Sequence, residues 1–118
     1  MMSTREHREA ERKDSLNLLD YVIIDANGVP ITRSMARTLN VSMKGILLET
    51  HIPLKKGQNL LITIGLGDNL LEIKAHVTHT EPCNQDKFCS GVGFENLDQK
   101  STKVLQQYLD AFNAEIDE

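Results

Sequence analysis

The sequence predicts an all-β fold, a six-stranded antiparallel β-barrel followed by a C-terminal α-helix. Three observations carry this prediction. Six short segments rich in β-forming residues follow one another at regular spacing, with turn signals between them. The fifth segment alternates between apolar and polar residues, which is the period of a half-buried strand. Near the end of the chain the spacing of apolar residues changes to three and four, which is helical.

The first four expected strands cover residues 18–25, 29–39, 45–50 and 59–65. The first two are joined by Asn27-Gly28, the strongest short signal of a hairpin, because both central positions of such a turn need positive φ. Residues 53–57 contain a proline and a glycine and predict the loop before the fourth strand.

The fifth expected strand has the clearest pattern. On it Leu71, Ile73, Ala75 and Val77 alternate with Glu72, Lys74, His76 and Thr78. This alternation predicts one buried and one exposed face. Residues 82–87 are typical of a turn, and residues 88–95 of a sixth strand. Gly91 and Gly93 lie inside that strand, where glycine often marks a bend or the close approach of another backbone.

The helix is expected at about residues 99–115, with Asp98 or Ser101 as its N-cap. Its apolar residues are Val104, Leu105, Tyr108, Leu109, Phe112 and Ile116. This face is expected to cover an open end of the barrel or to pack on a partner. A homodimer seam is an alternative use for it.

The 118 residues fit one domain that can bury a core without disulfides or a metal. We expect a flexible charged arm over residues 1–15 and the barrel with its helix over residues 16–118. The first 14 residues lack the apolar stretch of a secretory signal, and the chain has no apolar run long enough for a transmembrane helix. The expected location is therefore the cytoplasm, where the two cysteines are expected to be free thiols.

The net charge of −4 argues against general attraction to DNA, RNA or an anionic membrane. An anionic ligand would therefore need a local basic cluster. The best cluster is the arm, where Arg5, Arg8, Arg12 and Lys13 outweigh three glutamates among the first 13 residues.

Two short motifs stand out. The first is R-x-x-x-R, formed by Arg8 and Arg12, and the second is N-x-S-x-x-G, formed by Asn40, Ser42 and Gly45. Each alone has an ordinary explanation. Two arginines in a charged arm are usually a solvated face. Asn-x-Ser before a glycine is usually a turn, in which the glycine has positive φ.

Together, in this order and with one hairpin between them, the two motifs resemble those of the PilZ family. Residues 45–49 and 91–95 are similar to the strand after the second motif and to the late glycine-containing strand of that family. The resemblance implies a PilZ-type barrel and a bacterial receptor for the second messenger cyclic di-GMP. Carried over, the ligand-binding residues are Arg8, Arg12, Asn40, Ser42 and Gly45. Arg5 and His7 precede the first motif and are expected as secondary ligand contacts.

The chemistry of these residue types suits that ligand, which carries two phosphates and two guanines. The planar fork of arginine can make two hydrogen bonds to a phosphate or to guanine O6 and N7, and it can stack on a base. Asn40 and Ser42 can each donate or accept at a guanine edge. Gly45 has no Cβ and lets the ligand or another backbone come close. The arm is expected to order when it docks over these residues.

The resemblance implies a stand-alone sensor or adaptor that changes conformation on binding and regulates an effector protein, which the sequence does not name. The alternative is a protein-interaction module of the same fold that binds no nucleotide. We expect no enzyme, because Ser42 has no evident base partner and no phosphate-cradling loop opens a helix.

A metal site is not expected either. His76, His79, Cys83 and Cys89 are potential zinc ligands, but their spacing fits no common zinc signature. Residues three apart on a regular strand point to opposite faces, so His76 and His79 are expected to diverge.

Overall fold

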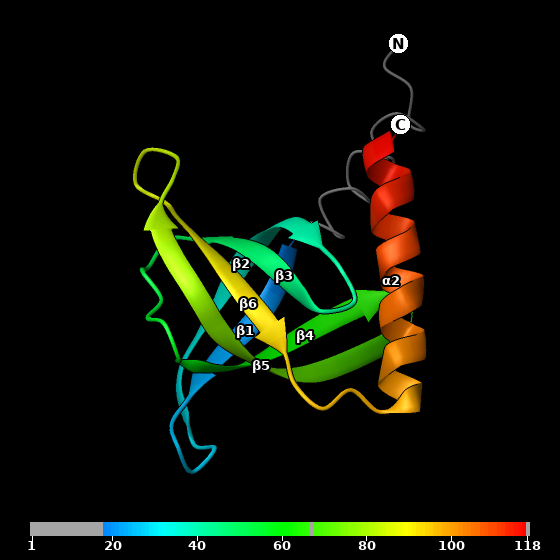
Figure 1. The fold of residues 1–118 in the computed structure, drawn as a ribbon, viewed down its shortest axis with the longest axis horizontal. Coiled ribbons are helices and arrows are strands. Elements are labelled where there is room, and N and C mark those ends of the chain that lie inside the picture. The colour runs from blue at the N-terminus through cyan, green and yellow to red at the C-terminus, as the bar shows by residue number, and fades with distance from the viewer. Residues whose placement is uncertain (1–17, 67, 118) are drawn as a thin grey trace.

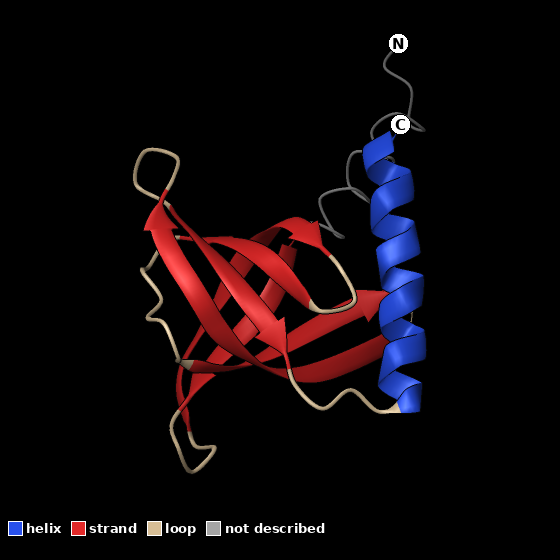
Figure 2. Ribbon diagram, in the orientation of Figure 1, coloured by secondary structure: helices blue, strands red, loops and turns tan. Residues whose placement is uncertain are grey.

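The computed structural model describes residues 18–66 and 68–117. The six strands are β1 (Leu18–Ile24), β2 (Pro30–Val41), β3 (Gly45–Thr50), β4 (Asn59–Leu66), β5 (Asn69–Pro82) and β6 (Phe88–Phe94), followed by helix α2 (Gln99–Asp117). They form a closed barrel in the order β1-β2-β3-β6-β5-β4, and every neighbouring pair is antiparallel. Figure 1 shows the barrel with α2 standing at one end of it, and Figure 2 separates strands from loops. The predicted all-β barrel with a C-terminal helix is confirmed.

The alternation of residues along the strands decides what fills the barrel. Inward-facing side chains from all six strands form one apolar cluster, to which β4 and β5 contribute most regularly. Its fully buried members include Tyr21, Leu48, Leu60, Ile62, Ile64, Ile73, Ala75 and Val77. The residues between them on the strands face outward. Most of these are at the surface, although Val22 and Glu49 are buried.

Helix α2 closes one end of the barrel. Leu105, Tyr108 and Phe112 are buried in the same apolar cluster as the strands, and α2 packs on β4 and β5. The hydroxyls of Tyr108 and Thr38 lie 3.5 Å apart, which links the helix to β2. The helix begins where predicted, because the Asp98 carboxylate accepts a hydrogen bond from the Ser101 amide at 2.7 Å. Among the described residues, no helix is long and apolar enough to cross a membrane.

The β1–β2 hairpin forms at the predicted place but with a different turn. Only Gly28 has positive φ, at 82°, and Asn27 does not. Gly28 donates its amide to the Asp25 carbonyl at 3.0 Å, and the Asp25 carboxylate accepts the amides of Asn27 and Val29. The turn is therefore stabilised by the Asp25 side chain, and Asn27 does not need the positive φ that we predicted for it.

The prediction of two free thiols is wrong in this structure, in which Cys83 and Cys89 form a disulfide with their Cα atoms 5.7 Å apart. The physical reason is the hairpin. Cys89 pairs with Glu81, and Cys83 lies two residues further along the chain, just past the end of β5. The two cysteines are therefore diagonal neighbours on one face of the hairpin, close enough to bond. Composition and compartment gave no sign of this juxtaposition.

Two buried phenols predict a loss of stability at alkaline pH. Burial raises the pKa of both Tyr21 and Tyr108 above the ordinary value of about 10, although for Tyr108 the hydrogen bond with Thr38 acts in the opposite direction. Below that value both phenols are neutral in the folded and unfolded states. Above it the unfolded chain ionises first, so the free energy of unfolding should fall as the pH rises through and beyond about 10.

Urea unfolding at a series of pH values measures this loss. Tyr21→Phe removes one of the two tyrosines and should make the alkaline decline shallower than in the parent chain. If the parent and Tyr21→Phe lose stability equally above pH of about 10, burial of the Tyr21 phenol is not a cause of the decline.

Candidate functional site

An open groove of about 340 Å³ lies on the outer face of the barrel across β3, β6 and β5. Figure 1 shows these three strands side by side. One wall of the groove is the β2–β3 turn with the strand ends beside it, from Asn40 to Leu47. The other wall is Thr78 and His79 of β5, and residues 91–93 of β6 lie between them. The structure thus brings Asn40, Ser42 and Gly45, all predicted from the second motif, to one concave surface.

Ser42 organises the turn that forms the first wall. Its amide donates to the Gly45 carbonyl at 2.8 Å, and its Oγ accepts the amides of Lys44 and Gly45 at 3.2 and 3.3 Å. The short hydroxyl side chain therefore satisfies the backbone of a turn in which strand pairing cannot do so. In the described part of the chain Ser42 therefore forms the turn, as serine in an Asn-x-Ser motif before a glycine usually does.

Asn40 stands at an irregularity of β2. The register of β2 on β3 shifts between Thr38 and Asn40, which leaves Leu39 unpaired and re-aims the residues that follow. The Asn40 side chain is exposed at the groove, and its Oδ1 accepts the Val41 amide at 2.9 Å. Its Nδ2 group has two further protons to donate, and phosphate oxygens or the O6 and N7 acceptors of guanine are suitable partners.

Gly45 is required by a close approach of backbones. A Cβ at this position would collide with the carbonyl oxygen of Val92 and lie 3.3 Å from the Cα of Gly93 on β6. The positive φ expected for this turn is absent, since the described glycines with positive φ are Gly28 and Gly57. Glycine at position 45 therefore allows β3 to begin directly against β6.

Gly91 and Gly93 have no side chains, so the outer face of β6 leaves room for side chains from a neighbouring strand. The imidazole of His79 lies where a Cβ on Gly91 would be, and the His76 ring lies 3.2 Å from the position of a Cβ on Gly93. The Nδ1 atom of His79 also lies 3.3 Å from the hydroxyl oxygen of Thr78. The glycines thus give two histidines of the neighbouring strand room to lie over the sheet.

The prediction that His76 and His79 point to opposite faces is wrong. The register of β5 on β6 shifts between Val77 and His79, so Thr78 is an extra residue and the alternation is broken once. Both histidines consequently face outward, opposite Gly93 and Gly91. Neither lies in a site with the cysteines, which are bonded to each other. His76 instead contacts Glu95, with 3.0 Å between Nδ1 and Oε2.

Sequence reasoning missed the other polar side chains of the groove, which are Lys44, Thr78 and His79. Gly91 and Gly93 were the available signal. Two glycines on the same face of a strand leave room above it for side chains of the neighbouring strand. Lys44 adds a positive charge, and none of the described lining residues is acidic. The described part of the groove is therefore suited to an anion with hydrogen-bonding edges.

Comparison with protein families gives one match that spans most of the chain, since the model of the PilZ domain matches residues 6–111. The chain belongs to the PilZ domain family. The match begins before both motifs and ends within α2, so it includes the whole barrel and the groove of this PilZ domain.

Solved PilZ domains share the fold. The PilZ domain with c-di-GMP of YcgR from Escherichia coli has a TM-score of 0.62 and 14% identity, and the alignment covers 84% of each chain. The PilZ domain of CeSA from a cellulose-synthesizing bacterium has a TM-score of 0.58 and 13% identity, over 81% of this chain and 93% of that one. Comparison with curated proteins gives no match.

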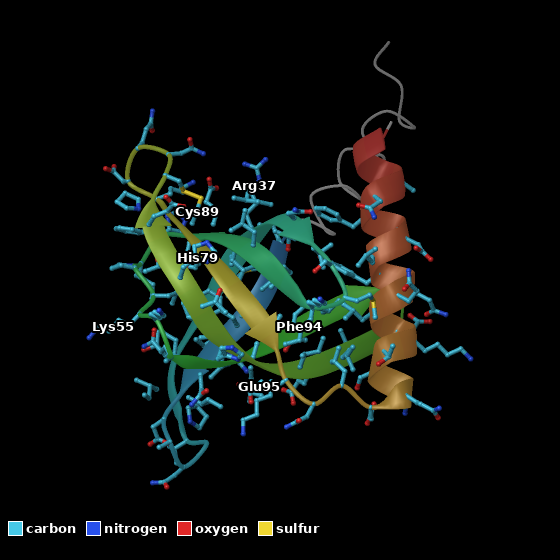
Figure 3. All side chains as sticks on the ribbon, viewed as in Figure 1. Arg37, Lys55, His79, Cys89, Phe94 and Glu95 are labelled. Carbon is cyan, nitrogen blue, oxygen red and sulfur yellow. A yellow bond between two sulfur atoms is a disulfide. The ribbon has the colours of Figure 1, made fainter. Side chains whose placement is uncertain are left out.

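The first motif of this PilZ domain lies outside the described residues. Arg8 and Arg12, like Arg5 and His7, belong to residues 1–17. The first strand begins immediately afterwards, at Leu18, and Figure 3 shows the described side chains of the barrel, with His79 labelled among those on β5 and β6.

Proposed function

We propose that this PilZ domain binds cyclic di-GMP in the groove between the β2–β3 turn and His79, with Arg8 and Arg12 completing the site. The observation that carries the proposal is the convergence of Asn40, Ser42 and Gly45 on one open groove with Lys44 and no described acidic lining residue. The PilZ domain of YcgR, which has the same fold and was solved with c-di-GMP, supports it. Binding, rather than catalysis, is the activity that we assign.

Each part of the ligand has a matching group in this proposal. The Asn40 Nδ2 donors face a guanine edge, and the Lys44 ammonium and the two arginines balance the phosphates. Gly91 of β6 makes room for the His79 ring, and that ring lines the groove where a base can contact it. Ser42 acts mainly by holding the turn in shape, because its oxygen already accepts two backbone amides.

The biological role that we propose is that of a sensor or adaptor in the cytoplasm. A ligand shifts a conformational equilibrium only as far as its affinity differs between the two states. Docking of the arginine segment over the groove would supply that difference, and the altered surface would then bind or release an effector protein.

Titration calorimetry with cyclic di-GMP tests the proposal directly, and a thermal melt with and without ligand provides an independent check. We expect saturable binding and a higher melting temperature, because the ligand binds only the folded state. Cyclic di-AMP, which has the same phosphates but different base edges, is the control ligand and should bind much more weakly. If cyclic di-GMP produces neither heat nor a shift, the proposed binding is wrong, and the alternative of a protein-interaction module is favoured.

His79 is expected to contribute to this affinity. His79→Ala removes an imidazole from the groove wall and should weaken cyclic di-GMP binding by about 2- to 10-fold. This is the loss of affinity expected when one hydrogen bond is removed. His51→Ala is the matched control, because His51 is an exposed histidine outside the groove. Calorimetry should show parent-like affinity for His51→Ala. Equal affinities for the two variants would remove His79 from the site.

A further inference from the structure

The Cys83–Cys89 disulfide lies at the end of the same two strands that carry the groove. Cys89 is two residues before Gly91 on β6, and Cys83 follows β5 four residues after His79. Alternate residues of a strand share a face, so Cys89 and Gly91 both lie on the outer surface. Figure 3 shows the disulfide and His79 on the same hairpin.

The disulfide ties a ladder that is short and irregular. Between the register shift at Val77/His79 and the turn, the paired residues run only from His79↔Gly91 to Pro82↔Phe88. A slip of one residue would remove the irregularity and turn His79 away from the groove. Two side-chain hydrogen bonds resist that slip, from Thr78 to the Gly91 carbonyl at 3.0 Å and from Ser90 to Thr80 at 2.8 Å. The covalent bond adds to them at the free end of the hairpin.

A buried carboxylate connects the disulfide to the third strand of the groove. One oxygen of Glu49 and both sulfur atoms lie within 4.8 Å of one another. Glu49 Oε2 accepts a hydrogen bond at 3.0 Å from Asn84, which lies inside the loop that the disulfide closes. Arg37 Nη1 is 3.9 Å from Oε1. Because Glu49 belongs to β3, this contact holds the β5–β6 turn against the strand that begins at Gly45.

We propose that Cys83 and Cys89 form a reversible redox couple that sets the shape of the groove. In the oxidised form the turn, the β5–β6 register and the Glu49–Asn84 contact are fixed together, and His79 is held over Gly91. Disulfides inside cells are usually transient and redox-sensing, and neither cysteine of this pair is buried, so a reductant can reach the bond. The effect on ligand binding rests on the proposed function, whereas the effect on the hairpin does not.

The reaction is an exchange with a dithiol. A thiolate of the dithiol attacks one sulfur of the disulfide and forms a mixed disulfide, and the second thiol of the reductant then displaces the remaining cysteine. The reductant loses two electrons and becomes a disulfide. Its two protons end on Cys83 and Cys89, which leave as thiols.

Two measurements on the complete chain test the couple without any ligand. Alkylation of free thiols followed by mass spectrometry should show that a dithiol opens the native disulfide and that an oxidant restores it. Hydrogen exchange should then show faster exchange at the amides of residues 78–80 and 89–93 in the reduced form. A disulfide that resists the dithiol in the folded protein, or equal exchange in both forms, would overturn the proposal.

Calorimetry with cyclic di-GMP completes the test. The reduced protein should bind at least about 5-fold more weakly than the oxidised protein, a modest allosteric coupling. The Cys83→Ser/Cys89→Ser variant should bind like the reduced form and be insensitive to dithiol. Equal affinities in the two forms would contradict control of the groove by the couple. If neither form binds while hydrogen exchange differs between them, the proposed function fails and the redox control of the hairpin stands.

Discussion

Replacing Arg8 or Arg12 by alanine should weaken cyclic di-GMP binding by roughly 10- to 150-fold each, measured by titration calorimetry. The expected loss is large because a hydrogen bond to a charged group contributes about 1.5–3 kcal/mol, and a guanidinium can make two such bonds to one phosphate. In the described groove Lys44 is the only residue with a permanent positive charge, so the arginines would supply most of the charge that two phosphates require.

Arg33→Ala is the matched control for these two variants. Arg33 is exposed on β2, outside the groove, and its contact in the structure is Asp20, at 3.8 Å. Its removal changes the net charge by the same amount as the other two substitutions but should leave affinity within about 2-fold, because exposed ion pairs contribute little. Parent-like binding by both Arg8→Ala and Arg12→Ala would exclude the first motif from the site.

Gly45→Ala should lower the melting temperature by roughly 5–15 °C and weaken ligand binding. The added Cβ would meet the carbonyl oxygen of Val92, which belongs to the backbone of β6 and cannot turn aside as a side chain could. Forcing a methyl group into such a contact typically costs about 1–3 kcal/mol. The strands must separate to relieve it, and both of them line the groove.

Gly93→Ala tests this explanation, because Gly93 pairs directly with Gly45 across the same two strands. The nearest atom to its added Cβ is His76 Cε1 at 3.2 Å, and that ring can move. Alanine also lowers the entropy of the unfolded chain, so Gly93→Ala should change stability by less than about 1 kcal/mol. Thermal melts compare the two variants. Equal destabilisation would mean that the loss of glycine as such, and not the Val92 carbonyl, matters.

The sequence predicted the elements better than it predicted their irregularities. The third strand has the expected bounds at Gly45–Thr50, and the alternation from Leu71 to Val77 places its apolar residues in the core. Strand β2 instead continues to Val41, and β5 begins at Asn69 and ends at Pro82. Both strands contain register shifts, at Thr38/Asn40 and at Val77/His79. A register shift is a property of a pair of strands, so neither sequence segment carries it alone.

The candidate site divides in the same way. The N-x-S-x-x-G motif identified Asn40, Ser42 and Gly45, and the structure brings them to one groove. Ser42 closes the turn and Gly45 admits a neighbouring backbone, and both were among the expected roles. The positive φ that was also expected for Gly45 is absent. The predicted roles of Arg8 and Arg12 remain predictions, because both residues lie outside the described part of the chain.

By itself the sequence determined the periodic features of this protein. Alternation with period two predicted the strands, spacings of three and four predicted α2, and turn residues predicted the hairpins. All of these signals depend only on residues within a few positions of one another. Only the tertiary structure decided which strands pair and in which register. That pairing placed His79 over Gly91, joined Cys83 to Cys89 and set Glu49 beside the disulfide. Such contacts join residues up to 40 positions apart, as Glu49 and Cys89 are, and one residue of register exchanges the inner and outer faces of a strand.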